Sequence, residues 1–108
     1  MTRVRLPTDR QGHVHKLKIG AASVYVVVNC DEQGRPMECF GFGDEGIKPE
    51  MDGLCGLTSI ALQHGTPLEK IIKFLRFRRY EPSGIAGQPL SVSDALGLVL
   101  EGYKKEEA

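Results

Sequence analysis

The stretch SVYVVVNCDEQGRPMECFGF, residues 23–42, sets the architecture of the chain. Its first part, 23–30, is apolar on both faces of an extended strand, so we expect it to be the central strand of a sheet and to need cover on both sides. Residues 31–36 carry Asp, Gly and Pro in the order of a hairpin loop. Residues 37–42 then return as the neighbouring strand, antiparallel to the first.

Elements on either side of this hairpin complete an α+β domain. Before it, residues 13–19 alternate between polar and apolar side chains, as in a strand with one face in water. After it, a Gly- and acid-rich loop at 43–53 leads to three segments with apolar residues at helical spacing. The order β-β-β-α-α-α predicts an antiparallel sheet of three or more strands packed against two to three helices.

Capping signals indicate where two of the helices begin. Thr66 can cap the second helix, with Pro67 in the first turn and Glu69 completing a capping box. Ser91, followed three residues later by Asp94, repeats this pattern for the third helix. Both helices should therefore begin with a side-chain oxygen bonded to a backbone N–H.

Length and charge restrict the function. We divide the 108 residues into a flexible N-terminal arm, 1–12, a single domain, 13–103, and a solvated tail, 104–108. Fourteen Lys and Arg residues balance fourteen Asp and Glu residues, so no global field would hold the protein on a long nucleic acid or a membrane. Three widely separated cysteines favour reduced thiols and a cytoplasmic location.

The sequence does not group its reactive side chains into a catalytic or metal site. The three histidines occupy positions that favour structural roles. Cys39 and Cys55 fall within a strand and an apolar helix, and Cys30 has no predicted partner that would activate it. The acidic loop at 43–53 lacks the spacing of a calcium loop. We therefore expect no catalytic residue, no metal and no cofactor, and we do not expect an enzyme.

The strongest candidate for binding is the stretch RFRRYEPSG, residues 76–84, where the second helix should end. The helix dipole explains one arginine there, but three within four residues repel each other unless an acid or a ligand anion neutralises them. Guanidinium groups suit phosphate, and aromatic rings can stack on a base. Glu81 is the alternative, intramolecular partner. The candidate ligand-binding residues for an anion or nucleotide are Arg76, Phe77, Arg78, Arg79 and Tyr80.

The first helix is a candidate for an interface because it is apolar nearly all round, which favours burial on two sides. Gly53 and Gly56 each cost this helix about 1 kcal/mol relative to Ala, so we expect another backbone to approach closely there. Together with Leu57 they form the candidate interface with a second copy of the chain or with another protein.

Three blocks of sequence lie in order along the chain at 16–42, 53–84 and 91–100. Their most specific pieces are DEQGRPMECF at 31–40, ALQHGTPLEKII at 61–72, and the run Phe77, Arg79, Tyr80, Glu81, Pro82 and Gly84. Taken together, residues 13–102 resemble the TSCPD domain, which is found near the C-terminus of adenosylcobalamin-dependent ribonucleotide reductases.

The motif that names this family, Thr-Ser-Cys-Pro-Asp, corresponds here to the stretch SVSDA. Ser91 and Asp94 are retained, whereas Val92 stands in place of Cys and Ser93 in place of Pro. The valine removes the cysteine that other members of the family offer to a metal or a redox partner. The resemblance therefore does not imply a metal site in this chain.

The resemblance implies a function without catalysis, because 108 residues cannot hold the reductase barrel with its radical-bearing cysteine and cobalamin site. The first interpretation is an accessory or regulatory module that associates with a separate large subunit of a cobalamin-dependent ribonucleotide reductase. The alternative is a small homo-oligomeric protein that binds or sequesters nucleotides through the arginine and aromatic cluster.

Overall fold

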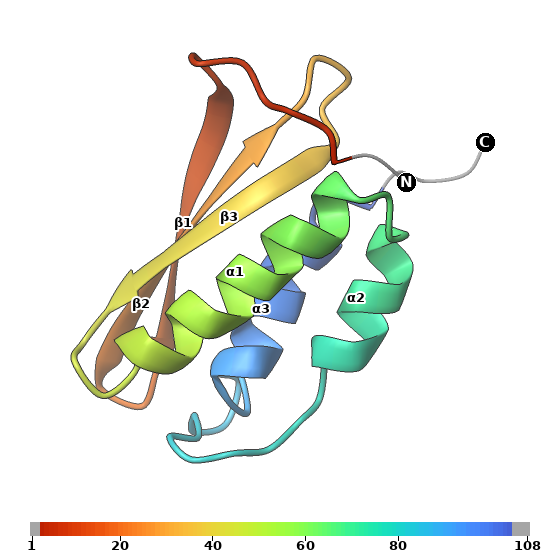
Figure 1. The fold of residues 1–108 in the computed structure, drawn as a ribbon. Coiled ribbons are helices and arrows are strands. Elements are labelled where there is room, and N and C mark those ends of the chain that lie inside the picture. Colours follow the sequence, from red (N-terminus) through yellow and green to blue (C-terminus); the bar gives the residue numbers. More distant parts are fainter. Residues whose placement is uncertain (1–2, 105–108) are drawn as a thin grey trace.

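The computed structural model describes residues 3–104 and arranges them as a sheet covered by helices (Figure 1). The antiparallel sheet has the order β1-β2-β3, with strands β1 (Gln11–Ile19), β2 (Ala22–Cys30) and β3 (Pro36–Gly43). The helices are α1 (Lys48–Gln63), α2 (Leu68–Leu75) and α3 (Val92–Glu101). The predicted α+β class and the order of its elements are confirmed.

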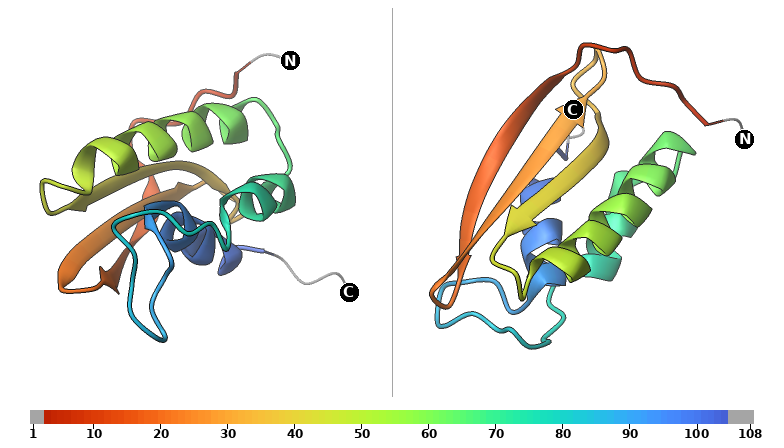
Figure 2. Two further views of the ribbon diagram at one scale, coloured as in Figure 1. Left: turned by 90° about the horizontal axis from the view of Figure 1, so that it is seen from below. Right: turned by 60° about the vertical axis from the view of Figure 1, so that its left-hand side comes forward.

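The central strand β2 buries only one of its two apolar faces within residues 3–104. Val24, Val26 and Val28 are 0% exposed and form the middle of the core. All three helices lie on one side of the sheet, as the right-hand view of Figure 2 shows. On the other side Phe40 and Phe42 of β3 are 48% and 52% exposed. The expected cover on the second face is therefore absent from the described part of the chain.

The first helix begins earlier than predicted, inside the segment 43–53 that we expected to be a loop. Helix α1 starts at Lys48, with a proline in its first turn. Its first turns pack on β3, where a Cβ atom on Gly41 would lie 1.8 Å from Cγ of Met51. Burial of Ile47 and Met51 outweighs the loop-like glycines and acids of this segment.

The second helix begins at Leu68 with Pro67 as its N-cap, and no side chain caps it. The predicted capping box of Thr66 and Glu69 is therefore wrong. The backbone N–H of Thr66 donates to the carbonyl of Ala61, so Thr66 belongs to the turn that closes α1. The cap of α3 is confirmed, because the Ser91 side chain accepts a hydrogen bond from the Asp94 N–H.

The N-terminal arm contacts the end of α1, whereas the last described residue, Lys104, is exposed. Ahead of β1, the backbone N–H of Val4 donates to the carbonyl of Gln63 in the last turn of α1, at 2.8 Å. The predicted solvated tail, 104–108, lies outside the described residues apart from Lys104, which is exposed. Between residues 3 and 104, no helix has the length and apolar character needed to span a membrane.

Candidate functional site

Asp94 lies where the segment after α2 meets the start of α3. The residue is 3% exposed, and its carboxylate accepts hydrogen bonds from Nη1 of Arg76 (2.6 Å) and from the backbone N–H groups of Phe77 (2.7 Å) and Leu90 (2.9 Å). Burial opposes ionisation, but these bonds and the arginine charge outweigh it and hold the pKa of Asp94 below its usual range. One carboxylate thus joins two segments that are distant in sequence.

The serines on either side of Val92 donate hydrogen bonds to two backbone carbonyls of this junction. Ser91 Oγ donates to the carbonyl of Arg78 at 2.6 Å, and Ser93 Oγ donates to the carbonyl of Leu75 at 2.9 Å. These carbonyls belong to the end of α2 and the residues just after it, which have no partner in that helix. The stretch SVSDA, singled out by its resemblance to the family motif, therefore anchors the arginine-rich stretch.

Arg76 belongs to this anchor and not to the open surface. Its side chain is 15% exposed and forms ion pairs with Asp94 at 2.6 Å and with Glu101 at 2.7 Å. Burial acts to lower the pKa of Arg76, but the two carboxylates outweigh it and raise that pKa. Gly97 of α3 makes room for this side chain, since a Cβ atom there would lie 3.0 Å from Cγ of Arg76. We therefore assign Arg76 a structural role.

Arg78 and Arg79 lie beyond the end of α2, which stops at Leu75. Arg78 donates to the carbonyl of Phe74 and lies over its ring, with the guanidinium carbon 4.1 Å from the ring centroid. Arg79 makes only a long hydrogen bond of 3.4 Å to Ser83 Oγ. Among residues 3–104 neither arginine forms an ion pair, so the predicted pairing with Glu81 is not found.

The two aromatic candidates beside these arginines are exposed. Phe77 is 70% exposed and Tyr80 is 49% exposed. The backbone of Phe77 has a φ of 65°, a left-handed conformation that is uncommon for a residue with a side chain. The hydrogen bond from its N–H to Asp94 helps to hold this backbone conformation, and the guanidinium carbon of Arg76 lies 4.1 Å from the centroid of the phenyl ring.

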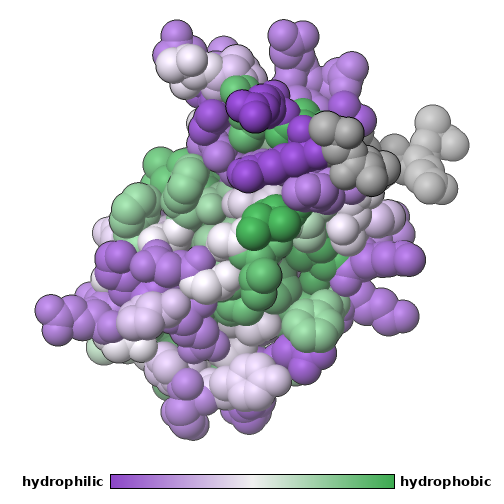
Figure 3. All heavy atoms as spheres, in the orientation of Figure 1, coloured by the Kyte–Doolittle hydropathy of each residue, from purple (hydrophilic) through white to green (hydrophobic). Residues whose placement is uncertain are grey.

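The candidate interface residues lie on the exposed side of α1. A Cβ atom on Gly53 or Gly56 would meet no heavy atom within 4 Å, so the close approach expected there is not made by any described part of this chain. Leu57 is 69% exposed. It lines an apolar groove of about 250 Å³ between α1 and α2, together with Ile71 and Phe74. Figure 3 shows this hydrophobic surface over the two helices.

The other reactive side chains make contacts that stabilise the fold. His15 Nε2 lies 2.7 Å from the Tyr103 hydroxyl at the end of α3, and burial, with a smaller contribution from His13, lowers the pKa of His15. Cys39 and Cys55 are buried, and Cys39 Sγ donates to the backbone carbonyl of Cys55 at 3.6 Å. The neighbouring Cys39 side chain, followed by burial, raises the pKa of Cys55. The described residues contain no cluster of three or more His, Cys, Asp or Glu side chains suited to a metal ion.

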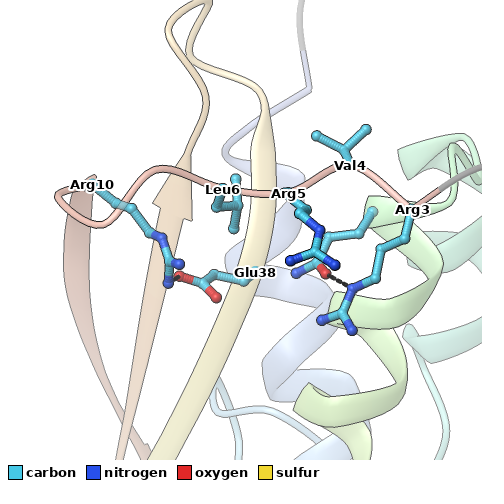
Figure 4. A pocket seen from close by; sticks show the side chains of 7 residues that line it. Arg3, Val4, Arg5, Leu6, Arg10 and Glu38 are labelled. Carbon is cyan, nitrogen blue, oxygen red and sulfur yellow. Dashed lines mark hydrogen bonds and ion pairs between the residues drawn. The ribbon is translucent and has the colours of Figure 1, made fainter.

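A polar cavity of about 480 Å³ lies beneath the N-terminal arm, and the sequence analysis missed it. Figure 4 shows it between the arm, β3 and the end of α1. Its lining residues are Arg3, Val4, Arg5, Leu6, Arg10, Glu38 and Gln63. The alternation of arginines at 3 and 5 with apolar residues at 4 and 6 was the available signal, because it is typical of an extended segment with one face turned to the protein.

Comparison with known proteins connects the whole described fold to one family. The sequence profile of the TSCPD domain matches residues 2–104. A vitamin B12-dependent ribonucleotide reductase of Rhodopirellula baltica is 40% identical over 85 residues, which is 76% of this chain and 8% of that protein. A protein of the same name from Agrobacterium fabrum is 29% identical over 90% of this chain and 8% of its own length. The chain thus spans less than a tenth of these two relatives. No solved structure matches it.

Proposed function

We propose, from the premise that this chain belongs to the TSCPD domain family, that it is a non-catalytic accessory module of vitamin B12-dependent ribonucleotide reduction. The support is that most of the chain corresponds to one small region of much larger reductases. A region that retains 40% identity is expected to retain its fold and its docking surfaces. The module would act in the cytoplasm, where its three free thiols stay reduced.

The observation that carries the proposed association is the uncovered apolar surface on α1 and α2. Leu57, Ile60 and Phe74 are each at least half exposed, at 69%, 50% and 62%. A contiguous apolar surface of this kind is typical of a protein interface. Gly53 and Gly56, on the same helix, leave space for the backbone of a partner to come close. The partner we propose is the large subunit of the reductase.

Turnover of the reductase provides the functional test. The cobalamin-dependent reductase of the organism that makes this chain is titrated with the purified chain, and its rate should change in a saturable manner. Leu57→Asp should remove the effect, because it places a charge in the apolar groove. Ile85→Asp is the matched control, since Ile85 is 68% exposed but lies in the loop before α3. An unchanged rate at a saturating concentration of the chain would contradict the proposal.

Nucleotide binding is the second candidate function, favoured by the exposed half of the arginine-rich stretch. Arg78 and Arg79 form no ion pair with any residue between 3 and 104, and Phe77 and Tyr80 offer exposed rings beside them. Calorimetric titration with nucleoside di- and triphosphates and cyclic oligonucleotides should then give salt-sensitive binding that Arg79→Ala weakens. The absence of a heat of binding across these ligands would remove this candidate.

Self-association is a further part of the proposal, and it involves the uncovered face of the sheet. The register aligns two rows of side chains on that face, Val14, Val27 and Phe40, and then Lys16, Tyr25 and Phe42. A second copy related by a two-fold axis along β2 would place the β1 row of each copy against the β3 row of the other. The smaller or cationic residues of β1 would then face the phenyl rings of β3, which is a complementary arrangement.

A further inference from the structure

The arm that precedes β1 closes a polar cavity at one end of the sheet, against β3 and the last turn of α1 (Figure 4). Its volume of about 480 Å³ is in the range of small-molecule sites, which runs from about 300 to 1,000 Å³. Three of the seven residues that line it are arginines. We propose that this cavity is a binding site for an anionic ligand that carries a phosphate group.

Hydrogen bonds hold the arm over the cavity. The backbone N–H of Val4 donates to the Gln63 carbonyl at 2.8 Å, and Arg3 Nε donates to the Gln63 side-chain oxygen. Further along the arm, Arg10 Nη1 donates to Glu38 Oε1 of β3 at 2.6 Å. Figure 4 shows the side chains of Arg3, Arg5 and Arg10 turned to the same side of the arm, toward β3 and α1. The guanidinium groups of Arg3 and Arg5 are thus turned to the cavity side of the arm before any ligand binds.

The cavity carries an excess of positive charge. Its three arginines and its one carboxylate, Glu38, leave two positive charges uncompensated among the lining residues. Glu38 is already satisfied, because its Oε1 accepts from Arg10 Nη1 at 2.6 Å and from Asn29 Nδ2 at 2.9 Å. The charges of Arg3 and Arg5 therefore remain for a ligand. A phosphate monoester, which carries nearly two negative charges at pH 7, matches this excess.

The hydrogen-bonding capacity of the cavity favours phosphate in the same way. Each guanidinium has five N–H donors in a planar fork, which suits two oxygens of one phosphate. Arg3 uses only its Nε, and Arg5 donates to no described residue. Most of the donors at this end of the cavity thus lack a protein acceptor within residues 3–104. A bound phosphate would supply several acceptors at once.

The alternative explanation is structural: these arginines would only stabilise the negative, C-terminal end of the α1 dipole. That role needs one cation near the last turn, and Arg3, through its bond to Gln63, already fills it. Arg5 adds a second charge at the same place and forms no ion pair within residues 3–104, so the helix dipole does not account for it and a bound anion would be stabilised by it. The site lies at the opposite end of the molecule from the stretch after α2 (Figure 1), so this inference is independent of the functions proposed above.

Calorimetric titration of the full chain at low ionic strength tests the inference, with inorganic phosphate, pyrophosphate and a nucleoside triphosphate as probes. We expect saturable binding of one anion per chain, weakened by added salt. Arg5→Gln should weaken it by about tenfold or more, since it removes both charge and fork. Arg5→Lys keeps the charge but loses the planar pair of N–H donors, so its affinity should lie between those of the wild type and Arg5→Gln.

Lys48→Gln is the control, because it removes an exposed cation at the start of α1, whereas the cavity lies at the last turn of that helix, and it should leave the affinity unchanged. Circular dichroism of each variant confirms that the fold is retained. The inference is overturned if no probe binds, or if the wild type and Arg5→Gln bind equally. Loss of binding in Arg79→Gln with retention in Arg5→Gln would also overturn it, and would assign the anion to the stretch after α2.

Discussion

The Asp94 carboxylate makes more hydrogen bonds than any other side chain described at the junction between α2 and α3, to Arg76, Phe77 and Leu90. Asp94→Asn keeps the size of the side chain but removes the charge that compensates Arg76, which is only 15% exposed. We expect a loss of about 2 to 3 kcal/mol in the free energy of unfolding, measured with urea and circular dichroism. Asp52→Asn is the control, since its ion pair with Lys48 is exposed and should contribute at most about 0.5 kcal/mol. Equal losses in the two variants would contradict the buried role.

The same carboxylate sets a pH dependence whose direction follows from its lowered pKa. The pKa of Asp94 in the folded state lies below its value in the unfolded chain, about 3.9. Its contribution is therefore fully present above pH 4 and is lost as the pH falls through the folded pKa. Below pH 4 the free energy of unfolding of the wild type should fall more steeply than that of Asp94→Asn. Parallel curves would show that Asp94 does not titrate with folding.

Gly97 permits the approach of Arg76 to α3. This contact predicts whether Gly97→Ala raises or lowers the stability of the protein. Alanine stabilises an open helical position by about 1 kcal/mol relative to glycine. At Gly97 its Cβ would lie within 3.1 Å of both Arg76 and Leu75, so we expect Gly97→Ala to destabilise the protein by about 1 to 3 kcal/mol. Gly56→Ala, in open space on α1, should stabilise it. The midpoint of thermal unfolding should fall for Gly97→Ala and rise for Gly56→Ala. A higher midpoint in both variants would contradict the packing of Arg76 against α3.

The edge strand β1 is tied to the end of α3 by the hydrogen bond between His15 and Tyr103. Because burial and His13 lower the pKa of His15, its neutral form stabilises the fold. This contribution is present above about pH 6.5 and is lost as the pH falls through the folded pKa. The protection factors of the β1 amides, which compare the observed exchange with the intrinsic rate at each pH, should therefore fall between pH 7 and 5.5 in the wild type and change less in His15→Gln. An equal change in both would exclude this role.

The elements that the sequence predicted correctly depend on neighbours along the chain. The hairpin from β2 to β3 and the Ser91 cap of α3 are set by residues only a few positions apart. The beginning of α1 was not predictable in this way, because it depends on the packing of Met51 against Gly41 in another element. The cap of α2 failed because Thr66 is held by the turn that closes α1.

For the binding residues too, the sequence indicated neighbours along the chain but not distant contacts. The sequence identified the arginine-rich stretch and offered a ligand anion or its neighbour Glu81 as alternative partners, whereas the structure pairs Arg76 with Asp94, 18 residues away. The cavity under the arm depends on bonds such as that of Arg3 to Gln63, 60 residues apart. The alternation at residues 3–6 could indicate an extended arm, but no periodic pattern identifies Gln63 as its partner, so only the folded structure reveals that contact.

Residues 3–104 expose apolar side chains on the open face of the sheet and over α1 and α2. From the strand rise and spacing, the sheet face measures roughly 30 Å by 15 Å, which is smaller than a standard interface of about 800 Å² a side. The proposed dimer should therefore be weak and dependent on concentration. The surface over α1 and α2 remains available to another protein in such a dimer, because it lies on the other side of the sheet.

Sedimentation velocity over a range of concentrations tests the dimer. The mean mass should rise with concentration for the wild type, and Phe40→Glu should hold the protein as a monomer, because Phe40 of β3 is 48% exposed on the open face. Ile85→Glu is again the control, and it should associate like the wild type. A wild-type mass that stays at the monomer value throughout would exclude self-association through this face.

Association with the reductase is tested most directly by size-exclusion chromatography with light scattering. The chain and the cobalamin-dependent reductase of its own organism are mixed in equal amounts. We predict that they elute together, that the mass of the complex exceeds that of the reductase by a whole number of chains, and that Leu57→Asp elutes separately while Ile85→Asp still co-elutes. Separate elution of the wild-type chain and the reductase, at concentrations high enough to saturate a micromolar complex, would contradict the accessory function.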